Sequence, residues 1–183
     1  MEKFNNKYRI PSARYPNWDY SSAGAYFITI CTHNREHYFG EIARDQLQYS
    51  NIGIIADILW HQIPYHRQNL ELGEFVVTPN HVHGILMIAP SSIETLHATS
   101  VSSSSDQTLH ATSLPPIPPK PNSISTIVRS YKSAVTRHAH RFGFEFQWQT
   151  RFHDHIIRDD RSFQKISEYI INNPSNWRGD KFF

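Results

Sequence analysis

Cysteine is almost absent from this chain of 183 residues, where Cys31 is the single example. One cysteine excludes a disulfide framework and a zinc site built from cysteines, and it fits a protein of the reducing cytoplasm. No apolar run reaches the length of about 18 residues that would indicate a membrane-spanning helix. The first seven residues lack the apolar core of a signal peptide, so we expect no secretion signal.

Net charge is also low, at +2, but its distribution is uneven. Between Ser123 and Arg158 six basic residues face only two acidic ones, Glu145 and Asp154, which gives a local charge of +4. A basic C-terminal third favours a polyanionic partner such as nucleic acid, although a solvated helix face would give the same count. The 12 histidines imply that any metal would be held by histidine together with oxygen ligands.

The hydrophobic content of 39% supports a packed core, and the length suits a single domain, residues 1–183. The patterns predict strands at residues 26–32, 72–77, 84–89 and 144–148, with 153–158 extending or following the last. They predict helices at residues 51–60, 123–142 and about 160–172. This order favours an α+β fold, with helices packed on one side of a mostly antiparallel sheet.

The stretch from about 90 to 122 breaks this pattern. It contains eight serines, a proline-rich end, and two copies of the hexamer Thr-Leu-His-Ala-Thr-Ser, at 95–100 and 108–113. Two copies are too few for a solenoid. We therefore predict a flexible insertion that has lengthened by local duplication.

Two histidines, His81 and His83, lie in the segment Pro-Asn-His-Val-His-Gly. Residues two apart on a strand point to the same face, so the two imidazoles would project side by side. Such a pair is half of a divalent-metal site. Ordinary hydrogen bonding near a strand end is the alternative interpretation.

A second group lies near the end of the chain, where Tyr169 and Asn173 are four residues apart and share a helix face. Lys165 precedes Tyr169 by one turn, and its ammonium would favour the phenolate, the nucleophilic form of tyrosine. Each residue also has a plain structural interpretation: Tyr169 as a packing residue, Asn173 as a helix cap, and Lys165 as a solvated side chain.

In the segment from Trp148 to Arg158, aromatic and basic residues interleave. A surface that stacks bases and holds phosphates needs this mixture. A half-buried strand with a polar edge would give the same pattern.

Taken together, four segments resemble one family: Tyr26–Thr32, Pro79–Gly84, Trp148–Arg158 and Tyr169–Pro174. They come in the order found in REP-associated tyrosine transposases, which belong to the HUH single-strand nucleases with one catalytic tyrosine. The resemblance implies a ferredoxin-like or RRM-like antiparallel sheet. It implies that His81, His83 and Asn173 bind Mg²⁺ or Mn²⁺ and that Tyr169 is the nucleophile.

The resemblance also implies a reaction. Tyr169 would cleave single-stranded DNA at hairpin-forming repeats through a covalent 5′-phosphotyrosine, and a 3′-OH could reverse the step to rejoin strands. Such a protein would act on DNA in the cytoplasm, associated with the nucleoid, as a monomer or homodimer and without a membrane partner. Candidate DNA contacts are Arg129, Lys132, Arg137, Trp148, Arg151, Phe152 and Arg158.

Two alternatives remain open from the sequence. A domesticated protein could bind hairpin DNA with little or no cleavage, although a pure binder would not need the four residues His81, His83, Tyr169 and Asn173. A hydrolase that uses metal-activated water fits less well, because no carboxylate base stands beside His81 or His83.

Overall fold

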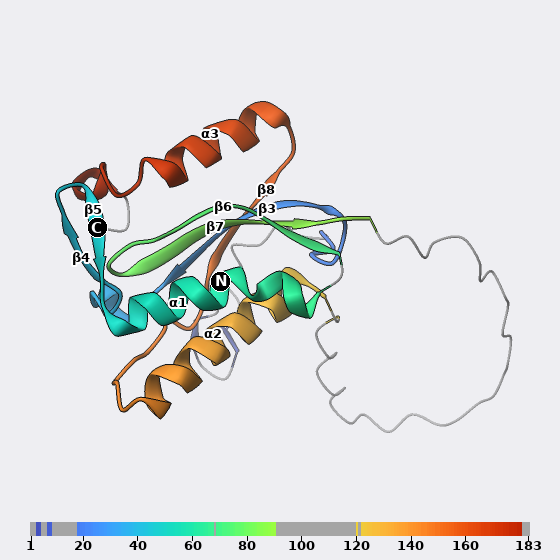
Figure 1. The fold of residues 1–183 in the computed structure, drawn as a ribbon. Coiled ribbons are helices and arrows are strands. Elements are labelled where there is room, and N and C mark those ends of the chain that lie inside the picture. Colours follow the sequence, from blue (N-terminus) through green and yellow to red (C-terminus); the bar gives the residue numbers. More distant parts are fainter. Residues whose placement is uncertain are drawn as a thin grey trace, which may run out of the picture.

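The structure, a computed structural model, describes residues 3–4, 7–8, 18–67, 69–90, 120 and 122–180. Its centre is a four-stranded antiparallel sheet with the spatial order β6-β7-β3-β8 (Figure 1). The strands are β3 (Gly24–Cys31), β6 (Leu70–Val77), β7 (His81–Ile88) and β8 (His153–Ile157). With the strands counted along the chain, this is the order of a ferredoxin-like sheet, which confirms the predicted α+β class.

Helices cover both faces of this sheet. Helices α1 (Asn51–His61) and α2 (Ile124–Arg141) pack against each other on one face, whereas α3 (Asp160–Ile171) lies on the opposite face and not on the same side as the other two, where we expected it (Figure 1). Each begins at a side-chain cap, because Ser50, Ser123 and Asp159 each accept a hydrogen bond from a backbone N–H of the first turn. Helix α3 packs on apolar side chains of the second face, because the central strands are apolar on both faces.

Strand β7 is buried along nearly its whole length, as expected for a central strand. Val82, Leu86 and Ile88 join the larger core under α1 and α2, while Ile85 packs in a smaller core under α3. Between these side chains Gly84 leaves room for the ring of Trp60, which lies directly against the strand. Helix α1 can therefore approach the sheet this closely only because Gly84 has no side chain.

Two further features differ from the sequence-based expectation. The hairpin of β4 (Gly40–Ala43) and β5 (Gln46–Tyr49) was not predicted; its turn residues Arg44 and Asp45 both have positive φ. The prediction of a strand at 144–148 is wrong. Burial does alternate there, but the backbone forms only an isolated bridge between Thr32 and Trp148.

The remaining described elements are short. They are strands β1 (Lys3–Phe4) and β2 (Lys7–Tyr8) and the 3₁₀ helices η1 (His33–Arg35), η2 (Ile63–His66) and η3 (Trp177–Gly179). Nearly all of the predicted insertion, including both hexamer copies, lies outside the described residues. None of the described helices has the length and apolar character needed to cross a bilayer.

Candidate active site

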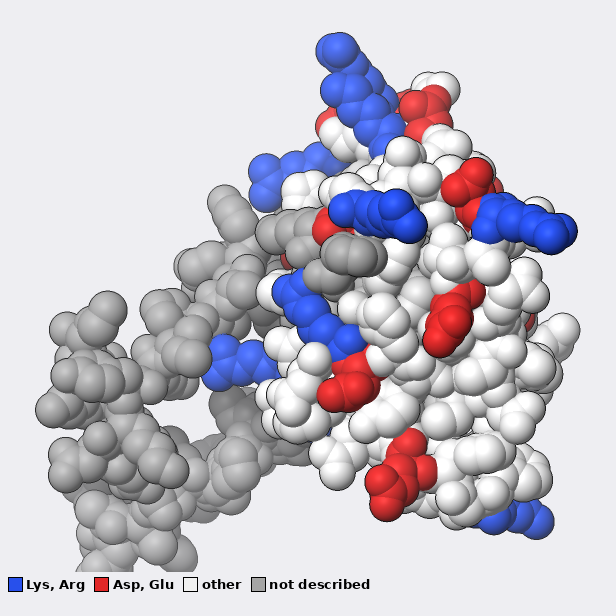
Figure 2. Space-filling view, turned by 90° about the vertical axis from the view of Figure 1, so that its left-hand side faces the viewer, with Lys and Arg blue, Asp and Glu red and all other residues white. Residues whose placement is uncertain are grey.

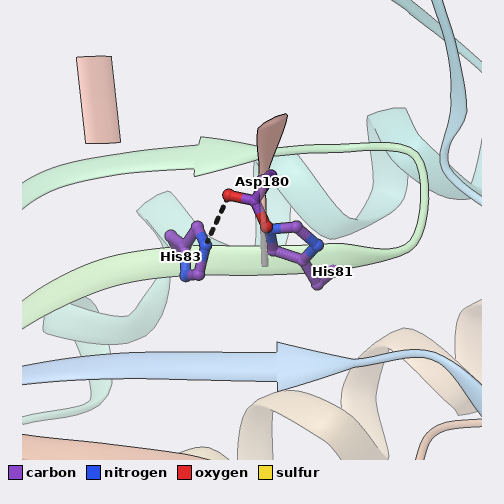
Figure 3. A group of neighbouring side chains, drawn as sticks. All are labelled: His81, His83 and Asp180. Atoms are coloured by element: carbon purple, nitrogen blue, oxygen red, sulfur yellow. Dashed lines mark ion pairs between the residues drawn. The ribbon is translucent and has the colours of Figure 1, made fainter. Parts of the chain in front are cut away.

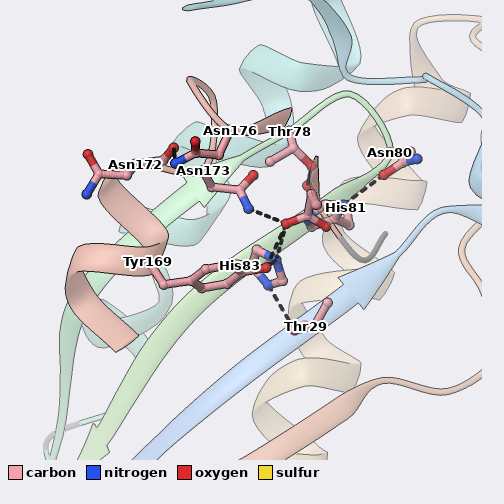
Figure 4. Close-up of polar contacts among 10 residues, drawn as sticks. Thr29, Thr78, Asn80, His81, His83, Tyr169, Asn172, Asn173 and Asn176 are labelled. Atoms are coloured by element: carbon pink, nitrogen blue, oxygen red, sulfur yellow. Dashed lines mark hydrogen bonds and ion pairs between the residues drawn. The ribbon is translucent and has the colours of Figure 1, made fainter. Parts of the chain in front are cut away.

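The two histidines of β7 lie side by side on the sheet face that carries α3. Both side chains are fully buried, and the ring centroids of His81 and His83 are 4.3 Å apart. His81 Nδ1 is 2.7 Å from Asn80 Oδ1, and His83 Nδ1 is 2.8 Å from Thr29 Oγ1 (Figure 4). These contacts hold each ring by its Nδ1 atom and leave Nε2 as the atom for a further ligand.

Burial also sets the protonation of these rings. It lowers the pKa of His81 well below its ordinary value, and His83 beside it acts in the same direction. Burial lowers the pKa of His83 as well, against the opposing effect of Asp180. Because Asn80 Oδ1 can only accept, His81 Nδ1 carries the proton and Nε2 carries a lone pair. A neutral imidazole with an available lone pair is the form that binds a metal.

Helix α3 brings Tyr169 to this pair. Phe163, Ile166 and Ile170 hold the helix against the sheet, and the Tyr169 hydroxyl lies 3.1 Å from His83 Nε2 (Figure 4). The ring remains 41% exposed and borders a surface hollow of about 310 Å³. A tyrosine hydroxyl is thus held at the His83 nitrogen, on a side chain that is partly open to solvent.

Asp180 completes the group, and sequence reasoning missed it. One ligand atom from each of His81, His83 and Asp180 lies within 4.8 Å of the other two (Figure 3). The carboxylate is 1% exposed, and its Oδ2 atom is 3.9 Å from His83 Nε2 and accepts a hydrogen bond of 2.6 Å from the Tyr169 hydroxyl. Helix η3 sets this position, because the Trp177 ring stacks on His81 at 5.6 Å.

Asn173, the predicted third ligand, lies beside this group. Its side chain is 2% exposed, and its Nδ2 donates a hydrogen bond to Asp180 Oδ2. Its Oδ1 atom is buried without a hydrogen-bond partner among the described residues, and a buried carbonyl oxygen of this kind suits a cation. The residue is not the helix cap, which is Asn172.

The donor set therefore fits a divalent cation. Two neutral imidazoles and one carboxylate lie together and are buried, with Asn173 beside them, and such mixed nitrogen and oxygen donors are typical ligands of divalent metals. Among the described residues, His81, His83 and Asp180 are the group whose geometry could hold a metal ion.

The expectation that Lys165 lowers the pKa of Tyr169 is wrong. Partial burial and the neighbouring Asp180 carboxylate instead raise the pKa of Tyr169 above its ordinary value, and Lys165 has no part in the shift. The hydroxyl donates to a carboxylate, an arrangement that favours the protonated form.

Five of the seven predicted DNA contacts line one groove of about 940 Å³ on the opposite side of the sheet. Its basic and aromatic lining consists of Lys120, Arg129, Lys132, Arg137, Trp148 and Phe152. Hydroxyl side chains such as Ser125 and Thr136 lie between them, and the acidic member Asp19 is paired with Lys120 at 2.6 Å. Arg151 and Arg158 are exposed but do not line this groove.

Charge is distributed differently on the face that carries β4, β5 and the end of the described chain. There Lys and Arg side chains lie among Asp and Glu side chains, and the described residues in view form no patch of one sign (Figure 2). The α2 groove therefore differs from this face in its predominantly basic lining.

No family model matches the sequence. An uncharacterised protein of Haemophilus influenzae is 37% identical over 173 residues, which cover 94% of this chain and 92% of that protein. The chain belongs to the family of this Haemophilus protein. The match extends over almost the full length of both family members, so it includes the strands and helices that build the site.

Solved structures extend the comparison of this family. A REP-associated tyrosine transposase bound to a REP hairpin aligns with a TM-score of 0.54 and 18% sequence identity, over 99% of this chain and 77% of that one. A putative transposase from Deinococcus radiodurans aligns with a TM-score of 0.40 and 16% identity, over 87% of this chain and 95% of that one. The first of these shows that the chain has the fold of a REP-associated tyrosine transposase.

Proposed function

We propose that this chain is a metal-dependent endonuclease and strand transferase that acts on single-stranded DNA at hairpin-forming repeats. The observation that carries the proposal is the position of the Tyr169 hydroxyl, 3.1 Å from His83 Nε2 and next to the group of His81, His83 and Asp180. A packing tyrosine would not need a buried pair of neutral histidines and a carboxylate at its hydroxyl. A tyrosine that acts as a nucleophile beside a metal ion needs these groups near its hydroxyl.

In the proposed reaction the Tyr169 oxygen attacks the phosphorus of one phosphodiester. An O–P bond to tyrosine forms, the P–O3′ bond breaks, and the departing 3′ oxygen gains the proton that tyrosine loses. The products are a 5′-phosphotyrosine and a free 3′-OH. Because the phosphodiester energy is kept in the tyrosine link, attack by a second 3′-OH rejoins strands by the reverse of the same step.

His81, His83 and Asp180 would hold the cation, Mg²⁺ or Mn²⁺, and we retain Asn173 as a fourth candidate through its Oδ1 atom. When bound, the ion polarises the scissile phosphate and offsets the charge that develops on its oxygens. The Tyr169 hydroxyl donates to the Asp180 carboxylate, and this contact favours the protonated form of the tyrosine.

The groove beside α2 supplies the proposed binding surface for the hairpin. Arg129, Lys132 and Arg137 would contact phosphates, and the aromatic rings of Trp148 and Phe152 lie at the same groove. Trp148 is itself fixed, since its Nε1 donates to the Lys132 carbonyl at 3.1 Å and its ring packs on Phe146. Such a protein would meet its DNA in the cytoplasm, at the nucleoid.

The test is covalent capture. The protein is mixed with labelled DNA hairpins that carry single-stranded flanks, in Mn²⁺, and resolved on a denaturing gel. We expect label to migrate with the wild-type protein and with the Tyr65→Phe variant, whose tyrosine is 86% exposed and far from the site in sequence. Tyr169→Phe should form no adduct and should still bind the hairpin.

Other outcomes distinguish the alternatives. Cleavage without protein-linked label would make water the nucleophile and overturn the role of Tyr169. Hairpin binding without cleavage, across several hairpin sequences, would favour the domesticated binding protein.

A further inference from the structure

Two rows of paired residues run across the sheet from β7 through β3 to β8, on the face that carries the candidate metal site. Thr29 is paired with His83 of β7 on one side and with His153 of β8 on the other. Phe27 is likewise paired with Ile85 and with His155. Directly paired residues of neighbouring strands point to the same face, so both rows lie on the face of His83 and Tyr169.

Phe27 connects these rows to the nucleophile. Its half-buried ring lies 5.2 Å from the ring of His83 and meets the Tyr169 ring edge-on at 6.2 Å. With strands spaced by about 4.8 Å, the β8 row lies roughly 10 Å from His83 across the sheet. The rings of Phe27, His155 and His153 therefore form a short series that leads away from Tyr169.

On this face, strand β8 is buried at Ile157 and exposed at His153 and His155. Helix α3 packs on the sheet through Phe163, Ile166 and Ile170, and its closest strand neighbours are β6 and β7. His153 and His155 are both exposed, and β8 is an edge strand of the sheet. A surface of three rings, half-buried at Phe27 and exposed at His155 and His153, thus begins where the proposed scissile phosphate would lie.

The chemistry of this surface suits a nucleobase. Phenyl and imidazole rings stack on any base, because every base has a π-face. The residues of β3 and β8 on this face, Ala25 to Cys31 and His153 to Ile157 at alternate positions, include no carboxylate that would repel DNA. Asp154 is the acidic residue of β8, and its side chain belongs to the opposite face.

We infer that Phe27, His153 and His155, the β3–β8 shelf, stack a base of the single-stranded DNA next to the scissile phosphate. The inference rests on the proposed function, because it assigns a positioning role in that reaction. The start of edge strand β8 then joins both DNA surfaces: Phe152, the residue before the strand, lines the α2 groove, and His153, its first residue, lies on the shelf. DNA held in the groove reaches the site by crossing this edge.

The first experiment measures stacking without cleavage. DNA hairpins with oligothymidylate flanks carry the fluorescent base 2-aminopurine at one flank position at a time, and binding is measured with the Tyr169→Phe variant. We expect quenching at one position, its loss when His155→Ala is added, and its retention when His66→Ala is added. His66 is an exposed histidine on the α1 and α2 side of the molecule. Uniform quenching at every position, or quenching that survives His155→Ala, overturns the shelf.

The second experiment uses the DNA that the wild-type protein captures. His155→Ala should raise the KM for adduct formation by about tenfold and leave kcat nearly unchanged, since one stacked base is lost. Removing that base from the DNA should cost wild type the same factor and cost the variant nothing further. Equal KM values for His155→Ala and His66→Ala would refute the role.

Together the two readouts separate the claims. Quenching without any covalent adduct would leave the shelf in place and reject the nuclease. Adduct formation that is unchanged by substitution of His153 or His155 and by removal of the flanking base would support the nuclease and reject the role of the shelf.

Discussion

Substitution of Gly84 by alanine tests how strand β7, which carries His81 and His83, packs against helix α1. A Cβ at this position would overlap Cζ2 of the Trp60 indole and would lie 2.9 Å from Cε2 and 3.0 Å from Cη2. The indole cannot move aside easily, because it is fully buried, stacked on Phe75 at 5.8 Å and met edge-on by Tyr131 at 5.2 Å. Either the ring or β7 must therefore shift.

The expected cost follows from these contacts. Overpacking a core by one methyl costs about 1–3 kcal/mol, and a ring held on both sides places this site at the upper end. Replacing a strand glycine returns about 0.5–1 kcal/mol of chain entropy. The net loss is about 2 kcal/mol, which for a chain of this length lowers Tm by roughly 4–8 °C.

Thermal unfolding followed by circular dichroism measures this loss. Gly179→Ala is the matched control, because a Cβ there has nothing within 4 Å and should change Tm little. Trp60→Phe removes the Cζ2 and Cη2 atoms of the indole, so Gly84→Ala should cost less in that background than in wild type. Equal Tm values for Gly84→Ala and Gly179→Ala would refute the packing argument.

Two further substitutions test the metal group and the groove. Asp180→Asn should lower Mn²⁺ affinity by at least about tenfold in calorimetric titration, because a charged donor of the buried group is lost. Glu168→Gln, at an exposed position, should leave the affinity unchanged. Equal affinities for the two variants would remove Asp180 from the site. Arg129→Gln should reduce the slope of log affinity against log salt concentration for hairpin DNA by about 1. Arg44→Gln, in the β4–β5 turn, should leave this slope unchanged. An unaltered slope for Arg129→Gln would show that this side chain contacts no phosphate.

Local patterns in the sequence were sufficient to predict the sheet and the histidine pair. The alternation at His81 and His83 follows from the period of a strand, and their shared face needs no knowledge of the remaining chain. The prediction started this strand at 84, three residues late, because the buried polar residues before Gly84 look like loop residues in a sequence. Local hydrophobicity does not indicate that both histidines are buried.

Asp180 could not be predicted in the same way. It follows Pro174, outside the helical pattern that relates Tyr169 to Asn173, so no periodicity connects it to the site. Its position depends on Trp177 stacking against His81, a contact between residues almost a hundred positions apart. A single acidic residue after a helix gives no signal of such a contact in the sequence.

The face chosen by α3 was likewise beyond local reasoning. The apolar positions Phe163, Ile166 and Ile170 predict a helix with one buried side, but both faces of the sheet offer apolar surface. The proposed strand at 144–148 failed for the opposite reason: its alternation is real, yet beyond the single bridge at Trp148 no neighbouring strand among the described residues completes a ladder with it.

Strand β7 has its two ends in different surroundings, and this has an evolutionary consequence. His81 begins the strand at the metal site, and Ile88 ends it about 23 Å away, where the chain runs into the segment between 90 and 122. Lys120, at the other end of that segment, borders the basic groove. We expect relatives with a longer or shorter segment between 90 and 122 to differ in hairpin binding at the groove rather than in the proposed cleavage by Tyr169.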